Sequence, residues 1–180
     1  MATITLRGQT TQTCGELPPI GHTAPAFTLL DNHLKACSLN DFSGQRKLIY
    51  TVPSLDTPVC AKSTRKLVEQ LHTASLSDDN IAVLIISADL PFAQQRFCKQ
   101  HKLNAIKSLS LHRDTAFGIG YGLIISDGPL AGLTARAILV LDEQDTVLYT
   151  ELVTEIGHEP DFNAALSAIQ AKAPAHHSCH

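Results

Sequence analysis

The segment Ile81–Ser87, with the sequence IAVLIIS, constrains the fold most, because it is apolar at almost every position. A strand exposed on one face alternates apolar and polar side chains, whereas a strand covered on both faces is continuously apolar. We therefore expect Ile81–Ser87 to be a strand of a sheet that is covered on both faces.

The flanking segments predict which strands lie beside it. Residues 47–52 (KLIYTV) predict a second strand, and a helical pattern over residues 59–71 connects it to Ile81–Ser87. Because a strand–helix–strand crossover joins parallel strands, we expect these two strands to be parallel. The remaining predicted elements are a helix at 91–101, a strand at 107–111, a hairpin of Ala137–Leu141 and Val147–Leu152, and a helix at 161–171. This order predicts an α/β thioredoxin-like fold, with a central mixed β-sheet flanked by helices.

The N-terminal region predicts two short hairpins. Thr3–Leu6 and residues 9–13 flank an Arg7-Gly8 turn, and residues 26–30 and 34–38 flank a second polar turn. With 180 residues the chain is long enough for one domain and short for two. We expect a single domain over residues 1–172, with residues 1–24 as a hairpin extension and residues 173–180 as a flexible polar tail.

Composition argues against several classes of function. The formal net charge is −3, no Lys/Arg run stands out and tryptophan is absent, which gives no support for nucleic-acid binding. No apolar run approaches the ~20 residues that span a bilayer, and the N-terminus lacks signal-peptide features, so we expect no membrane association and a cytoplasmic location. The five cysteines are odd in number and include no Cys-x-x-Cys pair, unlike a secreted disulfide framework.

The most informative segment runs from Pro53 to Cys60 (PSLDTPVC), between a predicted strand and a predicted helix. Cys60 falls in the first helical turn, where free backbone N–H groups and the helix dipole favour a thiolate. A free cysteine with a pKa of about 8.5 is only about 3% thiolate at pH 7. Lowering such a value by ~2.5 units takes about 3.4 kcal/mol, whereas a helix end supplies about 0.3–2 kcal/mol. A cation is therefore needed.

Two arginines are candidates for that cation. Arg136 directly precedes the apolar strand Ala137–Leu141, a boundary where a charged side chain needs a partner. Arg65 lies on the same helix as Cys60 but five residues away, off the i, i+4 line. Thr57 is expected to cap the helix, and the alternative role of its hydroxyl is to donate a hydrogen bond to a substrate at Cys60.

Three segments resemble the thiol peroxidase subfamily of the peroxiredoxins, over about residues 3–170. They are PSLDTPVCAKSTRK at 53–66, SADLPFAQQRFC at 87–98 and GPLAGLTARA at 128–137. The resemblance implies that Cys60 attacks hydrogen peroxide and alkyl or lipid hydroperoxides. It implies that Thr57 and Arg136 orient the peroxide and stabilise charge on the leaving oxygen, and that Pro53 belongs to the same active-site motif. It implies that Cys98 resolves the Cys60 sulfenic acid through an intrachain disulfide of the atypical two-cysteine kind. It further implies recycling by thioredoxin and a homodimer, with no cofactor or metal.

Alternatives to this assignment remain open. If Cys98 were inert, the protein would be a one-cysteine peroxidase resolved by an external thiol. A redox-sensing module would use the same cysteines without turnover. Because a disulfide needs Cα atoms within ~7 Å, we expect local unwinding around Cys60 and Cys98 on oxidation. Cys14 and Cys37 are interpreted as structural, and the tail with Cys179 as a solvated segment rather than a metal site. The sequence does not rank peroxides or reductants.

Overall fold

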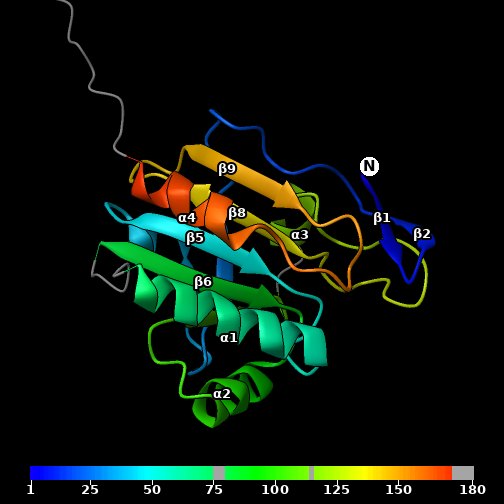
Figure 1. The fold of residues 1–180 in the computed structure, drawn as a ribbon, viewed down its shortest axis with the longest axis horizontal. Coiled ribbons are helices and arrows are strands. Elements are labelled where there is room, and N and C mark those ends of the chain that lie inside the picture. The colour runs from blue at the N-terminus through cyan, green and yellow to red at the C-terminus, as the bar shows by residue number, and fades with distance from the viewer. Residues whose placement is uncertain (75–79, 114–115, 172–180) are drawn as a thin grey trace, which may run out of the picture.

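The computed structural model describes residues 1–74, 80–113 and 116–171, so the predicted tail at 173–180, with Cys179, lies outside the described residues. The strands are β1 (Thr3–Leu6), β2 (Gln9–Gln12), β3 (Thr28–Leu30), β4 (Ala36–Ser38), β5 (Arg46–Thr51), β6 (Ile81–Ser87), β7 (Lys107–Ser110), β8 (Ala137–Leu141) and β9 (Val147–Leu152). The helices are α1 (Pro58–Thr73), α2 (Pro91–Gln100), α3 (Ala116–Gly120) and α4 (Phe162–Gln170), with a 3₁₀ turn, η1, at Leu39–Phe42 (Figure 1). In the described residues, no helix combines the length and apolarity needed to cross a membrane.

Seven strands form a mixed sheet in the order β4-β3-β7-β6-β5-β8-β9. The continuously apolar β6 lies at its centre, parallel to β5 and β7, as the crossover rule predicts. β8 runs antiparallel to β5, and the β8–β9 hairpin completes that side. The predicted mixed sheet is therefore confirmed.

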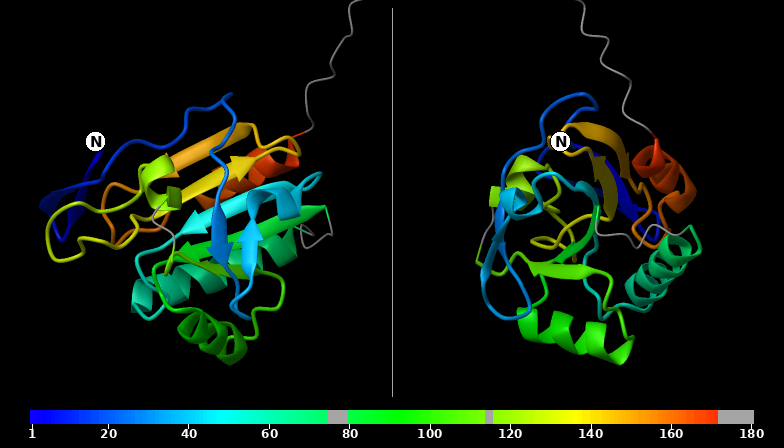
Figure 2. Two further views of the ribbon diagram at one scale, coloured as in Figure 1. Left: turned by 180° about the vertical axis from the view of Figure 1, so that it is seen from behind. Right: turned by 90° about the vertical axis from the view of Figure 1, so that its left-hand side faces the viewer.

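Helices cover both faces of the sheet (Figures 1 and 2). On one face Leu67 of α1, Phe97 of α2 and Phe162 of α4 pack with Tyr50 and Ile85. The other face packs against η1 and α3 through a cluster that includes Leu39, Phe117, Ile49 and Leu84. The sequence did not predict η1 and α3, because elements of four and five residues are too short to show helical periodicity.

The two predicted hairpins have different positions in the fold. β1 and β2 form a separate two-stranded sheet, whose Ile4 is fully buried against the rest of the protein. Thr5 of β1 accepts a backbone hydrogen bond from Ile156 and donates one to Thr154, which anchors the hairpin to the segment after β9. The β3–β4 hairpin instead joins the main sheet through Leu30, opposite Ser110 of β7.

The parallel arrangement places the carboxyl ends of β5 and β6 at one edge of the sheet. Open α/β sheets present their functional loops at this edge. The segment from Pro53 to Thr57 follows β5 and leads into α1, while residues 88–90 follow β6 and lead into α2. The fold thus brings the loop before Cys60 next to the start of the helix that carries Cys98.

Candidate active site

The start of α1 has the cap that the sequence predicts. Thr57 is the N-cap residue, and its hydroxyl oxygen accepts a hydrogen bond from the backbone N–H of Cys60 at 3.3 Å. Pro58 takes the first helical position, where the missing N–H has no partner to lose. The Thr57 hydroxyl donates to the Ser54 carbonyl at 3.1 Å, so it must turn from Ser54 before it can donate to a substrate. Cys60 therefore lies in the first helical turn.

Arg136 contacts Cys60 directly from the segment before β8. Its guanidinium donates through Nη2 to the Cys60 Sγ at 3.1 Å. Its other donors reach the Tyr50 hydroxyl through Nη1 and the Ile156 carbonyl through Nε, each at 2.9 Å. Arg136 is only 1% exposed and Cys60 is fully buried. Of the two candidate cations, the structure brings Arg136 to Cys60 and leaves Arg65 on the exposed face of α1.

Within residues 1–74, 80–113 and 116–171, no carboxylate forms an ion pair with Arg136. A buried charge without a counter-charge is costly, so Arg136 needs a negative partner nearby. The Cys60 sulfur is in position to be that partner as a thiolate. Two unit charges 4 Å apart attract by about 4 kcal/mol at an effective dielectric constant of about 20. This attraction exceeds the stabilisation that a helix end gives to a thiolate. Arg136 is therefore the cation that the sequence analysis required.

The surrounding groups keep the guanidinium charged. Burial acts against the charge of Arg136, but the proximity of Tyr50 and Cys60, with hydrogen bonds to both, raises the pKa of Arg136 overall. Burial also raises the pKa of Tyr50, although the Arg136 guanidinium acts in the opposite direction. Tyr50 therefore remains a neutral phenol that accepts from Arg136 and shares a 2.9 Å hydrogen bond with Ser63.

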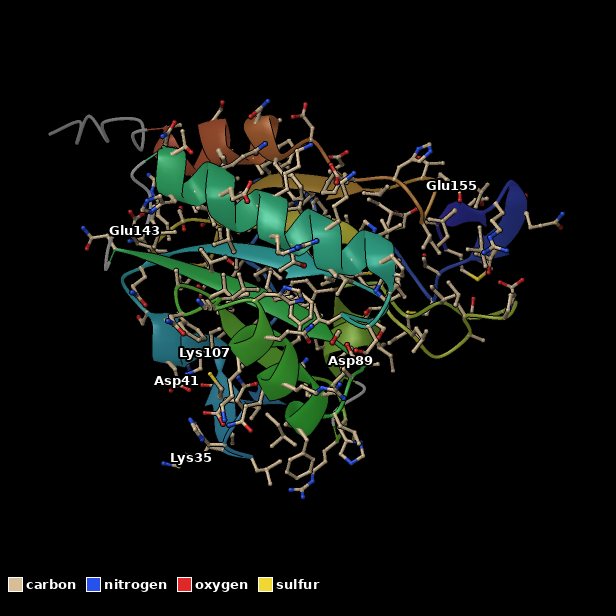
Figure 3. All side chains as sticks on the ribbon, turned by 60° about the horizontal axis from the view of Figure 1, so that its bottom comes forward. Lys35, Asp41, Asp89, Lys107, Glu143 and Glu155 are labelled. Atoms are coloured by element: carbon tan, nitrogen blue, oxygen red, sulfur yellow. The ribbon has the colours of Figure 1, made fainter. Side chains whose placement is uncertain are left out.

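A cavity of about 340 Å³ reaches Arg136, the hydrogen-bond partner of Cys60, although Cys60 itself is not among the residues that line it. Pro53, Thr57 and Arg136 line it, so the structure brings these three predicted site residues together around one space. Apolar side chains dominate the rest of its wall, including Leu6, Val59, Leu130, Leu133 and Ile156. Glu155 also lines the cavity and lies next to the N-terminal hairpin in Figure 3. The site can therefore admit a small polar oxidant or the apolar end of a larger molecule.

Cys98 lies apart from this cavity, in the last turn of α2. It is half-buried, and its Sγ lies 3.8 Å from the Ser108 hydroxyl oxygen, which donates to the Asn32 side chain at 2.6 Å. Burial raises the pKa of the Cys98 thiol, although its side-chain interactions with Ser108 and Asn32 act to lower it. Cys60 and Cys98 are both free thiols, so the structure describes the reduced state.

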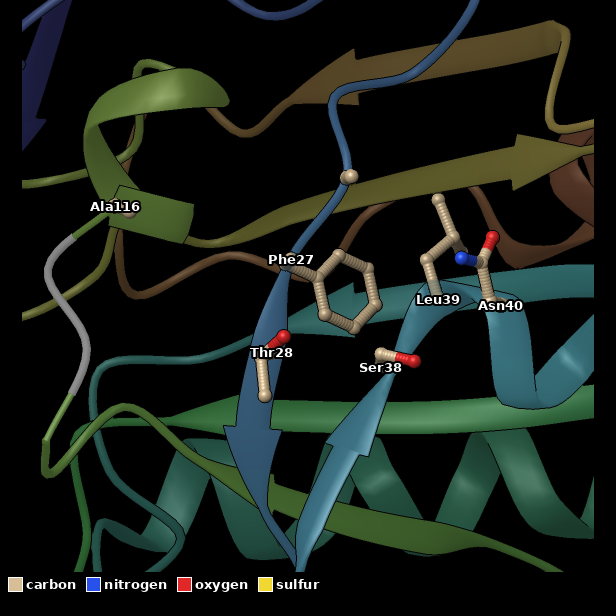
Figure 4. Close-up of a pocket in the computed structure, with 7 residues that line it drawn as sticks. Phe27, Thr28, Ser38, Leu39, Asn40 and Ala116 are labelled. Carbon is tan, nitrogen blue, oxygen red and sulfur yellow. The ribbon is translucent and has the colours of Figure 1, made fainter.

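The other described cysteines lie away from the Cys60–Arg136 pair. Cys37 is buried in the core, where burial raises the pKa of its thiol, and Cys14 is exposed with its Sγ 3.5 Å from the Gly118 carbonyl. A second cavity, of about 330 Å³, lies beside Phe27 and Leu39 and is lined by none of the predicted site residues (Figure 4).

Two groups at the site were missed by the sequence reasoning. Tyr50 lies in an apolar strand, where it looks like an ordinary core residue, yet its hydroxyl orients Arg136. Asp89 lies within the SADLPFAQQRFC segment, yet no role was assigned to it. Its carboxylate holds the loop before Cys60 through Ser54 and Leu55. Pro91, two residues after Asp89, indicated only that a helix begins there.

Comparison with known proteins gives a consistent result. Residues 19–166 match the Redoxin family. The thiol peroxidase of Mycobacterium tuberculosis strain H37Rv is 47% identical over 171 residues, covering 95% of this chain and all of that protein. A peroxiredoxin-like protein from Aquifex aeolicus superposes with a TM-score of 0.86 at 31% identity, covering 94% of this chain and 96% of that one. The thiol peroxidase from Chromobacterium violaceum has a TM-score of 0.86 at 27% identity, covering 93% and 95%.

The fold, together with the buried cysteine–arginine pair at the start of a helix, defines a thiol-dependent peroxidase of the redoxin class. Within that class the chain belongs to the thiol peroxidase subfamily of the peroxiredoxins. It is an enzyme that reduces peroxides with a thiol.

Proposed function

We propose that Cys60 is the peroxidatic cysteine, that Cys98 resolves its oxidised form, and that thioredoxin returns both to thiols. The observation that carries the proposal is the 3.1 Å contact between Arg136 Nη2 and Cys60 Sγ, at a buried position without a carboxylate partner in the described chain. This arrangement favours the thiolate, which is the nucleophilic form of cysteine.

In the first step the Cys60 thiolate attacks the terminal oxygen of a hydroperoxide. A sulfur–oxygen bond forms as the oxygen–oxygen bond breaks, which leaves Cys60 as a sulfenic acid and releases an alkoxide or hydroxide that takes up a proton. Arg136 is placed to stabilise the charge that moves from sulfur to the leaving oxygen. The Thr57 hydroxyl can assist by exchanging its Ser54 acceptor for the peroxide.

In the second step the thiolate of Cys98 attacks the Cys60 sulfenic sulfur. A disulfide forms, and hydroxide leaves and is protonated to water. Cys98 starts half-buried against Ser108, so it must leave that contact, and the end of α2 must unwind. Two thiols of thioredoxin then reduce the disulfide by exchange.

The cavity supports hydrogen peroxide and alkyl or lipid hydroperoxides as substrates. Its lining includes the polar side chains of Thr57 and Arg136, while Leu6, Leu130 and Ile156 offer apolar surface to a hydrocarbon group. We also propose a cytoplasmic homodimer. Exposed apolar side chains on Phe92 and Ile119 provide surface that a second copy would cover.

A coupled assay with thioredoxin, its reductase and a hydroperoxide tests this function. Wild-type protein should turn over continuously, and Cys60→Ser should abolish turnover. Continued catalytic peroxide consumption by Cys60→Ser would contradict the proposal. If Cys98→Ser turned over at the wild-type rate with thioredoxin, the one-cysteine scheme with an external resolving thiol would replace the intrachain disulfide. Light scattering of the full chain tests the dimer.

A further inference from the structure

Asp89, labelled in Figure 3, lies between β6 and α2. Its carboxylate accepts three hydrogen bonds. The Ser54 hydroxyl donates to Oδ1 at 2.6 Å, and the Leu55 backbone N–H donates to Oδ2 at 2.8 Å. The Ser87 hydroxyl donates to Oδ2 at 2.7 Å. None of the ion pairs among the described residues includes Asp89. The three hydrogen-bond donors to the Asp89 carboxylate are therefore neutral groups, and two of them lie in the loop before Cys60.

The same network continues into the helix that carries Cys98. Gln94 of α2 is fully buried, and its side-chain amide donates to the Ser87 hydroxyl oxygen at 3.0 Å and to the Leu109 carbonyl at 2.8 Å. The Ser110 hydroxyl donates to the backbone carbonyl of Asp89 at 2.5 Å. Asp89 and Ser87 thus connect α2 and β7 to the opposite loop.

On the loop side the connection reaches Cys60 in two further hydrogen bonds. Ser54 donates to Asp89 through its side chain, and its carbonyl accepts from the Thr57 hydroxyl at 3.1 Å. Thr57 in turn accepts from the backbone N–H of Cys60. The position of the cap over Cys60 therefore depends on an anchor at the start of α2.

We propose that Asp89 is a positioning residue that clamps the Cys60 loop in the geometry for peroxide attack and releases it when the segment around Cys98 unwinds. The inference rests on the proposed two-cysteine cycle. Attack requires the folded loop, whereas disulfide formation requires both cysteine segments to leave it. An interaction made only in the folded arrangement speeds the first step and slows the second.

The substitution Asp89→Asn tests the clamp with little change in shape. Three donors converge on the carboxylate, and an amide has one acceptor oxygen and an NH₂ group that is itself a donor. The Ser54 hydroxyl must therefore turn from donor to acceptor to keep its contact, and every contact that remains loses the carboxylate charge. Because hydrogen bonds to a carboxylate are roughly twice as strong as neutral ones, we expect kinetic effects of about ten-fold for the attack step and about three-fold for the disulfide step.

The experiment follows both steps in the reduced full-length protein mixed with one equivalent of hydrogen peroxide. Samples are acid-quenched at millisecond intervals, treated with a thiol-blocking reagent and analysed by intact mass, because the chain has no tryptophan to report by fluorescence. Sulfenic acid at Cys60 reports attack, and loss of the Cys98 thiol to the disulfide reports resolution. Asp89→Asn should slow attack and accelerate disulfide formation.

Two further variants separate positioning from general stability. Asp142 anchors the β8–β9 turn by accepting hydrogen bonds from the backbone N–H groups of Gln144 and Thr146, each at 2.9 Å. Asp142→Asn should leave the rates of both steps within about two-fold of wild type, the usual size of the effect of a surface substitution. Ser54→Ala should reproduce part of the effect. Its combination with Asp89→Asn should give less than the product of the two single effects.

The outcomes separate the clamp from the function on which it rests. If wild-type protein formed no disulfide between Cys60 and Cys98, the proposed cycle would fail whatever the variants did. With a normal wild-type cycle, the clamp is overturned if Asp89→Asn leaves both steps unchanged or slows both. It is also overturned if Asp142→Asn has an equal effect, or if the Ser54 and Asp89 effects multiply independently.

Discussion

Replacing Arg136 with methionine should remove the interaction on which the chemistry of Cys60 depends. Methionine has a similar length and suits a buried position, so the change mainly removes the charge and three donors. An attraction of about 4 kcal/mol, the value for unit charges ~4 Å apart at an effective dielectric constant of about 20, corresponds to a factor of about 10³ in rate. The cost of burying the thiolate offsets part of this, so we expect a loss of about 10²–10³.

The assay is the second-order rate constant for oxidation of Cys60 by hydrogen peroxide at pH 7, measured with alkylation of Cys60 by iodoacetamide in the same samples. Both rates should fall in Arg136→Met, and Arg136→Lys should be intermediate, because one ammonium group cannot reach all three acceptors. Arg65→Met is the matched control and should behave as wild type. An Arg136→Met enzyme within about five-fold of wild type would refute the reasoning, since the removed charge is worth far more.

Three further predictions test the surrounding groups. Hydrogen bonds from Thr5 and the hairpin backbone lower the pKa of Glu155 to about 2. The stabilisation from the ionised Glu155 is therefore present above pH 4.5 and lost as the pH falls towards 2. The difference in Tm between wild type and Glu155→Gln should vanish over that range, and a constant difference would contradict this. Burial raises the pKa of Cys98, and the interaction of its thiol with the Ser108 hydroxyl acts to lower it. Ser108→Ala should therefore move the alkylation profile of Cys98 to higher pH, and an unchanged profile would count against this interaction. Tyr50→Phe leaves a buried guanidinium donor unpaired, so the free energy of unfolding in urea should fall by about 1–3 kcal/mol. An unchanged urea midpoint would contradict this.

The sequence predicted the helices and strands that are long enough to show a repeating pattern of apolar side chains. β6 matches its predicted bounds because its residues are apolar almost throughout and all of them except Ile81 are buried. Pro58 and Pro91 mark the starts of α1 and α2 because proline suits the first helical turn. The pairing of β3 with β7 joins residues far apart in the chain, and no local pattern encodes such a contact.

The candidate site was predictable where a residue type conflicts with its surroundings. Arg136 stands out because a cation beside an apolar strand needs a partner, and the structure places it on Cys60. Tyr50 does not conflict with its strand, so its hydroxyl contact with Arg136 could not be foreseen. The link from Asp89 to Ser54 depends on the parallel pairing of β5 and β6, which brings two loops to one edge.

The most direct test of the account is a peptide mass map of reduced wild-type protein after one equivalent of hydrogen peroxide. The account predicts loss of two hydrogen atoms and one cross-linked peptide pair that joins Cys60 to Cys98. In Cys98→Ser the same treatment should add one oxygen atom to Cys60. Free thiols at both Cys60 and Cys98 after the peroxide is consumed, or oxidation that begins at another cysteine, would contradict it.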